Sequence, residues 1–176
     1  MRLWSYQPKT TVVTLQQGVR HTCSWQWVQG ERWQAAYQLM VPQMEQCQIP
    51  IGDNAPVWAW HSVKRYGGKP DELCALMLLS ELELEAGIDL IELNVPDALV
   101  LLSSYPHWNE ILFAILGREE PPAEAIEKCF KVETSPRKGR PPYYYPEIQA
   151  CLPYIEPNWL VGWEVLDTEE ILRLRS

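Results

Sequence analysis

The residues best suited to chemistry lie in one short stretch, where three tyrosines precede a glutamate and a glutamine. The stretch reads Tyr143-Tyr144-Tyr145-Pro146, followed by Glu147, Ile148 and Gln149. If Ile148 begins a strand, Glu147 and Gln149 share one of its faces and both can address one ligand. Tyr144 offers a ring for stacking, while the two polar side chains can bond ribose hydroxyls. The pattern predicts a nucleotide site here, although it also fits a solvated strand edge stiffened by prolines.

The proline-rich loop that leads into this stretch, residues 131–146, is locally basic. It carries four basic residues against one acidic residue: Lys131, Arg137, Lys138 and Arg140 against Glu133. Such a loop can attract phosphate groups, and arginines beside tyrosines also fit single-stranded nucleic acid. The whole chain has a net charge of -8 and a pI near 4.9, which disfavours a general binder of nucleic acid or of anionic membranes.

A second aromatic stretch, Pro56-Val57-Trp58-Ala59-Trp60-His61, predicts a short strand. Side chains alternate along a strand, so Trp58 and Trp60 share one face and His61 lies on the other. Indoles of this size usually fill a core. His61 fits either a structural role or a functional one, because its charge can change near neutral pH.

Motifs of several enzyme classes are missing from the chain. It contains no GxxxxGK[ST] loop, no GxGxxG fingerprint, no HExxH and no GxSxG, so nucleotide hydrolysis, Rossmann-type redox and serine hydrolysis lose their usual sequence support. The five cysteines are scattered without a CxxC pair, which predicts reduced and mostly buried thiols. His21 and Cys23 supply only two of the four ligands of a structural zinc site, so we predict no metal centre.

Length and composition favour one compact domain over residues 1–176, without disulfides or metals. The N-terminus lacks the apolar region of a signal peptide, and no apolar run reaches the roughly 20 residues of a spanning helix. We therefore expect a cytoplasmic protein with no membrane segment. The nine tryptophans and eight tyrosines belong to residue types enriched at binding hot spots, so the alternative hypothesis is a non-catalytic protein-interaction module, a regulator or an inhibitor.

Hydrophobic periodicity and turn residues predict alternating strands and helices. Pro42 should kink or end the first half of the second helix. The predicted strands cover residues 3–7, 57–61, 88–95, 148–155 and 159–165. The predicted helices cover about 10–18, 31–46, 71–86, 104–117, 121–130 and 168 onward.

Four motifs resemble a bacterial family catalogued only as a domain of unknown function, number 3841. They are PVWAWH, KPD at Lys69 to Asp71, NVPDALVLLSSYPHW at Asn94 to Trp108, and IQACLPYIEPNWLVGWEV at Ile148 to Val165. The resemblance runs from LWSYQ almost to the C-terminus. It implies no established activity.

The layout is also similar to that of ADP-ribosyltransferase-like domains, in the strand, helix and glycine from Leu3 to Gly18 and in QxxxP from Gln149 to Pro153. This resemblance implies an α+β domain with a mixed or antiparallel split sheet, several peripheral helices, and NAD as substrate.

The same resemblance implies roles for individual residues. Glu147 would orient or deprotonate an acceptor, and Gln149 would hold the ribose. The other cleft residues would be Ser5, Trp60, His61 and Tyr144. The superfamily places its catalytic glutamate where this chain has Gln149, and a neutral amide supplies a hydrogen bond without the charge that stabilises an oxocarbenium-like transition state.

Overall fold

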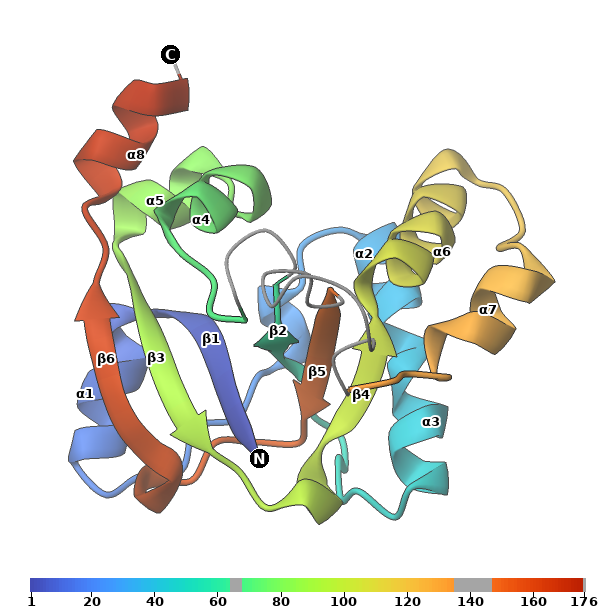
Figure 1. Cartoon of the computed structure of the whole chain (residues 1–176), viewed down its shortest axis with the longest axis horizontal. Coiled ribbons are helices and arrows are strands. Elements are labelled where there is room, and N and C mark those ends of the chain that lie inside the picture. The colour runs from blue at the N-terminus through green and yellow to red at the C-terminus, as the bar shows by residue number, and fades with distance from the viewer. Residues whose placement is uncertain (64–67, 135–146, 176) are drawn as a thin grey trace, which may run out of the picture.

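The computed structural model describes residues 1–63, 68–134 and 147–175. Strands and helices alternate along the chain, as Figure 1 shows. The strands are β1 (Arg2–Pro8), β2 (Val57–Ser62), β3 (Ile88–Asn94), β4 (Leu101–Ser104), β5 (Ile148–Leu152) and β6 (Leu160–Val165). The helices are α1 (Lys9–Gln16), α2 (Glu31–Gln38), α3 (Met40–Gln46), α4 (Glu72–Leu78), α5 (Glu81–Ala86), α6 (Tyr105–Gly117), α7 (Ala123–Cys129) and α8 (Thr168–Arg175). Single turns of 3-10 helix are η1 (Trp25–Trp27), η3 (Asp97–Leu99) and η4 (Pro157–Trp159).

The six strands form one sheet in the order β4-β5-β2-β1-β3-β6, and every neighbouring pair is antiparallel. The sheet is split in the middle. β1 pairs with β3 along its whole length, from Arg2 to Pro8, whereas β1 and β2 share only the pair Trp4 and Trp60 among the described residues. The sheet therefore consists of two halves, β4-β5-β2 and β1-β3-β6, which confirms the predicted α+β class with an antiparallel split sheet.

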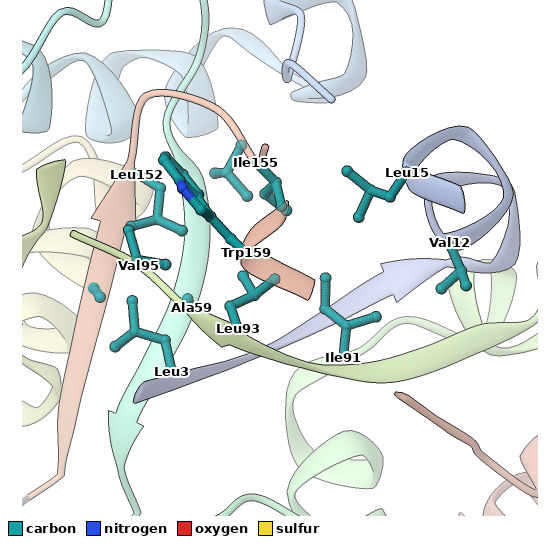
Figure 2. Close-up of a cluster of buried hydrophobic side chains, with 12 residues drawn as sticks. Leu3, Val12, Leu15, Ala59, Ile91, Leu93, Val95, Leu152, Ile155 and Trp159 are labelled. Atoms are coloured by element: carbon teal, nitrogen blue, oxygen red, sulfur yellow. The ribbon is translucent and has the colours of Figure 1, made fainter. Parts of the chain in front are cut away.

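One face of the sheet is covered by α1 and by the segment around η4. Leu3, Ile91 and Leu93 point from the strands toward Leu15 of α1 and toward Trp159, all in one buried cluster (Figure 2). Residues of this cluster come from both halves of the sheet, including Ala59 and Leu152 (Figure 2). Burial of apolar side chains therefore holds the two halves together where β1 and β2 share only one residue pair among the described residues.

The other face is covered by two separate groups of helices. Over β4 and β5, the cluster that contains Leu101 and Cys151 includes Met40, Trp108 and other residues of α2, α3, α6 and α7. Over β1 and β3, the cluster that contains Trp4 and Leu90 includes residues of α4, α5 and α8. Figure 1 shows α4, α5 and α8 to the left of β2, and α6 and α7 to the right of β5.

Two predicted long helices are each broken into two. The helix expected over 31–46 is interrupted at Leu39, three residues before Pro42. Proline has no backbone N–H, so Pro42 cannot donate the hydrogen bond that would continue the helix. The helix expected over 71–86 is interrupted at Leu79, and a new helix begins at Ser80. The Ser80 hydroxyl accepts from the Glu83 backbone while the Glu83 carboxylate accepts from the Ser80 backbone, a capping box that starts α5.

The short strand β4 was not predicted. Ser103 and Ser104 looked like caps of the following helix, and Ser104 is indeed the residue before α6. The four residues that end there nevertheless pair with β5, from Leu101 opposite Cys151 to Ser104 opposite Ile148. Most of the predicted loop at 131–146 lies outside the described residues.

Asp89, on β3, is a buried carboxyl group whose Oδ1 has no hydrogen-bond partner among the described residues; the whole residue is 4% exposed. Burial raises the pKa of Asp89, while the nearby charge of Lys9 acts in the opposite direction. A carboxyl whose pKa is higher in the folded state weakens the fold as pH rises through its unfolded and then its folded pKa.

Replacing Asp89 with asparagine should therefore raise the free energy of unfolding at pH 7 relative to the parent chain. The gain should vanish at about pH 3, below the unfolded pKa of about 3.9. Urea titrations at both pH values measure it. The exposed Asp53→Asn serves as control, and an equal gain for Asp89→Asn at both pH values would contradict the burial argument.

Candidate functional site

A row of four side chains crosses the split in the sheet. Ser103 on β4 and Trp60 on β2 both pair with Gln149 on β5, and Trp60 pairs with Trp4 on β1. Directly paired residues of antiparallel strands place their side chains on the same face. Ser103, Gln149, Trp60 and Trp4 thus form one row, here called the Gln149 row, which lies between the two groups of helices on that face.

The row holds polar atoms that are buried without a partner. Ser103 is fully buried and Gln149 is 5% exposed, yet Ser103 Oγ and Gln149 Nε2 have no hydrogen-bond partner among the described residues. The indole nitrogen of Trp4 shares this state. A buried polar group without a partner costs about 1–3 kcal/mol, so such a concentration calls for an explanation. Hydrogen bonding to a bound molecule would supply one.

Aromatic rings and a thiol form the wall beside the row. The rings of Trp60 and Tyr105, at the start of α6, meet edge to face with centroids 4.9 Å apart. Cys74 of α4 and Tyr6 of β1 belong to the same cluster as Trp60. The Tyr6 hydroxyl donates to the backbone oxygen of Asp71, which fixes the first strand to the start of α4. Both halves of the sheet therefore contribute to one wall.

The Cys74 thiol and the Tyr6 phenol beside the row are both neutral at physiological pH. Burial raises the pKa of the Cys74 thiol to about 11, and the charges of Asp71 and Glu147 act in the same direction. Burial also raises the pKa of Tyr6, again with help from Cys74 and Asp71. A thiol with so high a pKa is protonated at pH 7 and is a poor nucleophile. The arrangement is suited to hydrogen bonding and stacking.

Glu147, Gln149 and Trp60, all predicted from the sequence, lie in one region. Gln149 and Trp60 are direct neighbours across β5 and β2. Glu147 is half-buried just before β5; its backbone oxygen accepts from the Tyr105 nitrogen at 3.0 Å, and its charge contributes to the pKa of Cys74. Tyr144 lies outside the described residues.

Ser5 is not part of this region. It alternates with Trp4 and Tyr6 along β1, so its side chain lies on the opposite face of the sheet. Its hydroxyl donates to the backbone oxygen of Trp58 at 2.6 Å and accepts from Gln7 Nε2 at 2.8 Å. Ser5 is fully buried, and these bonds give it a structural role.

His61 lies next to Trp60, where the register between β2 and β5 shifts. Its Nδ1 is 3.2 Å from the Ser62 hydroxyl, and burial lowers its pKa. The histidine is therefore neutral at pH 7. It occupies the irregular position of the strand and is not a member of the Gln149 row.

Ser103, Trp4 and Tyr105 were missed by reasoning from the sequence. Ser103 and Tyr105 belong to a segment that predicts a helix start, and Trp4 looked like an ordinary strand residue. The consecutive residues Leu101 and Leu102, followed by two serines, are the one local hint of a strand. Side chains alternate along a strand, so Ser103 would lie on the same face as Leu101.

Neither a metal-binding cluster nor a membrane-spanning helix occurs in the described ranges 1–63, 68–134 and 147–175. No group of three or more His, Cys, Asp or Glu side chains there is placed to hold a metal ion. No described helix is both long enough and apolar enough to cross a membrane.

Comparison with known proteins gives one family match. The family model described as "Domain of unknown function (DUF3841)" matches residues 2–116, a range that includes Trp4, Trp60 and Ser103 but ends before Gln149. Searches of curated proteins and of solved structures found no match. Since the matched range covers more than half of the sequence, the chain belongs to the DUF3841 family.

Proposed function

We propose that the Gln149 row binds the nicotinamide ribose part of NAD or of a related nucleotide. The observation that carries the proposal is the pair of unpartnered buried groups, Gln149 Nε2 and Ser103 Oγ, next to the Trp60 ring. An amide donor, a hydroxyl and an aromatic ring are the groups that bond and stack on a sugar with an attached planar ring.

The split of the sheet supports the same proposal. The resemblance to ADP-ribosyltransferase-like domains implies a split sheet and a site residue on a late strand, and Gln149 on β5 is one strand away from the junction of Trp4 and Trp60. Tyr6, which belongs to the Trp60 cluster, replaces Ser5 as the first-strand residue of the proposed site.

The chemistry of the row favours binding over transfer. ADP-ribose transfer passes through a positively charged, oxocarbenium-like transition state, which a fixed negative charge stabilises. Gln149 supplies no charge, and Glu147 is the one acidic residue of the stretch from Tyr143 to Gln149. We therefore propose a nucleotide-binding domain in which Gln149 holds the ligand and Glu147 serves as orienting group.

Gln149→Leu separates binding from folding. It removes the unpartnered Nε2 and keeps most of the volume, so the unliganded chain should be as stable as the parent chain or more stable. In thermal-shift and calorimetric titrations the parent chain should be stabilised by NAD, by about 2.7 kcal/mol at 100 times the dissociation constant, and Gln149→Leu should show no such gain.

The exposed Gln46→Leu is the matched control and should retain the response to NAD. Absence of any shift or heat with the parent chain at millimolar NAD would refute the proposal. The same result for Gln149→Leu and the parent chain, with both stabilised, would place the nucleotide elsewhere.

A protein-interaction module is the second candidate, because Trp27 is 72% exposed and Trp33 is 40% exposed. Trp25 is half-buried and Trp159 is buried at 7% exposure, so only part of the tryptophan content is available to a partner. A pull-down from the native host in which no partner is recovered in stoichiometric amount would count against this candidate.

A further inference from the structure

A pocket of about 480 Å³ lies between three segments of the chain that are apart in the sequence. Trp25 of η1 lines it, together with Val41 and Pro42 at the start of α3. The loop before β2 contributes Asp53 and Asn54. A pocket of this size is in the range of small-molecule sites, which combine apolar and aromatic surface with a few polar groups.

Hydrogen bonds hold the segments around the pocket in place. The Ala55 nitrogen donates to the Cys23 oxygen at 2.8 Å, which joins the loop before β2 to the segment before η1. Gln34 Nε2 of α2 donates to the backbone oxygens of Trp25 and Val28, at 3.3 and 3.0 Å, which joins η1 to α2. The pocket is therefore preformed, so a ligand loses little binding free energy to ordering of the protein.

The one charged group that lines the pocket is the carboxylate of Asp53. Asp53 is exposed, and it forms no ion pair with another residue in the described part of the chain. Asn54 Nδ2 donates to the Ile51 backbone oxygen at 3.4 Å, so Asn54 Oδ1 is the atom left to accept from a ligand. None of the residues that line the pocket is basic. The lining is therefore complementary to a cation that donates hydrogen bonds.

We propose that this pocket binds a guanidinium group, as carried by arginine and its small derivatives. A guanidinium is planar and stacks on an indole, and the half-buried Trp25 leaves part of its ring to the pocket. Its N–H groups form a fork that matches a carboxylate, here that of Asp53, and a remaining N–H can donate to Asn54 Oδ1. The net charge of -8 on the chain favours the approach of a cation.

The pocket is separate from the Gln149 row. The residues that line it lie between Trp25 and Asn54 in the sequence, and none of them belongs to the row. Guanidinium binding can therefore be tested without NAD, and its failure would leave the nucleotide proposal untouched.

Calorimetric titration with three matched ligands tests the proposal. N-acetyl-argininamide should bind the parent chain saturably. N-acetyl-citrullinamide carries a neutral urea of nearly the same shape and should bind at least about tenfold more weakly, because the charge-assisted hydrogen bond is lost. N-acetyl-lysinamide keeps the charge without the planar fork and should also bind more weakly than the arginine derivative. Absence of saturable binding of the arginine derivative would overturn the proposal, as would an equal affinity for either of the other two ligands.

Asp53→Asn tests the role of the carboxylate at an exposed position, where the substitution leaves the core intact. It should weaken binding of N-acetyl-argininamide by about tenfold or more. Glu45→Gln is the matched control, because it removes the same charge from an exposed residue of α3 that does not line the pocket, and it should keep the affinity of the parent chain. An Asp53→Asn chain that binds as tightly as the parent chain, or equal losses in the two variants, would show that no guanidinium is held by Asp53.

Discussion

Replacing Trp159 with alanine is expected to lower the free energy of unfolding by about 3–5 kcal/mol, the usual cost of removing a large aromatic side chain from a core. Trp159 is 7% exposed and packs in the cluster that joins both halves of the sheet (Figure 2). Its ring also stacks on Tyr154, with centroids 5.3 Å apart, and the guanidinium of Arg20 lies 4.1 Å from the centre of the Tyr154 ring. The substitution therefore empties a core position and weakens the stack beside it.

Urea unfolding followed by tryptophan fluorescence and by circular dichroism measures this loss. The matched control is Trp27→Ala, which removes the same atoms from a side chain that is 72% exposed and should change the free energy by less than about 0.5 kcal/mol. Equal losses in the two variants would show that Trp159 does not support the core.

The second large effect is expected from Ser5→Ala, which should cost about 1–3 kcal/mol. The Ser5 hydroxyl joins the halves of the sheet, because it donates to the Trp58 backbone of β2 while it belongs to β1. Alanine leaves both the Trp58 oxygen and the Gln7 amide without this partner in a buried place. Denaturant titration gives the change in stability.

Thr14→Ala is the control for Ser5→Ala. The Thr14 hydroxyl donates to the Thr10 backbone oxygen within α1 and lies near the surface, so its loss should be small. A Ser5→Ala chain as stable as the parent chain would mean that the bond across the split contributes nothing. NAD binding should survive Ser5→Ala, because Ser5 lies on the face opposite the Gln149 row.

Most elements were predictable because their signals are local. Pro8 is the last residue of β1, and Pro96 comes shortly after the end of β3. Gly87 ends α5 with a positive φ of 85°, a conformation that suits glycine. Pro42 predicted the break in the helix over 31–46, which lies at Leu39. The break at Leu79 was not predicted, since apolar residues continue across it at helical spacing. The helix predicted over 71–86 is divided by the capping box of Ser80 and Glu83, a local feature that the longer apolar periodicity concealed.

The candidate site was predictable only in part. Gln149 and Glu147 followed from residue types and spacing along one segment. The row itself depends on which strands are neighbours and in what register, and β2, β4 and β5 are far apart in the sequence. Ser5 was assigned to the cleft from the resemblance to ADP-ribosyltransferase-like domains, yet the pairing of Trp4 with Trp60 places Ser5 on the other face.

The two halves of the sheet are interleaved along the chain. β1 belongs to one half and β2 to the other, β3 returns to the first, β4 and β5 lie in the second, and β6 closes the first. Neither half is a continuous segment, so no single backbone cleavage between strands separates one half intact. Each half must be completed by contacts between distant parts of the chain, which raises contact order and slows folding. We therefore expect the last strand, β6, to be needed before the half that begins at the N-terminus is complete.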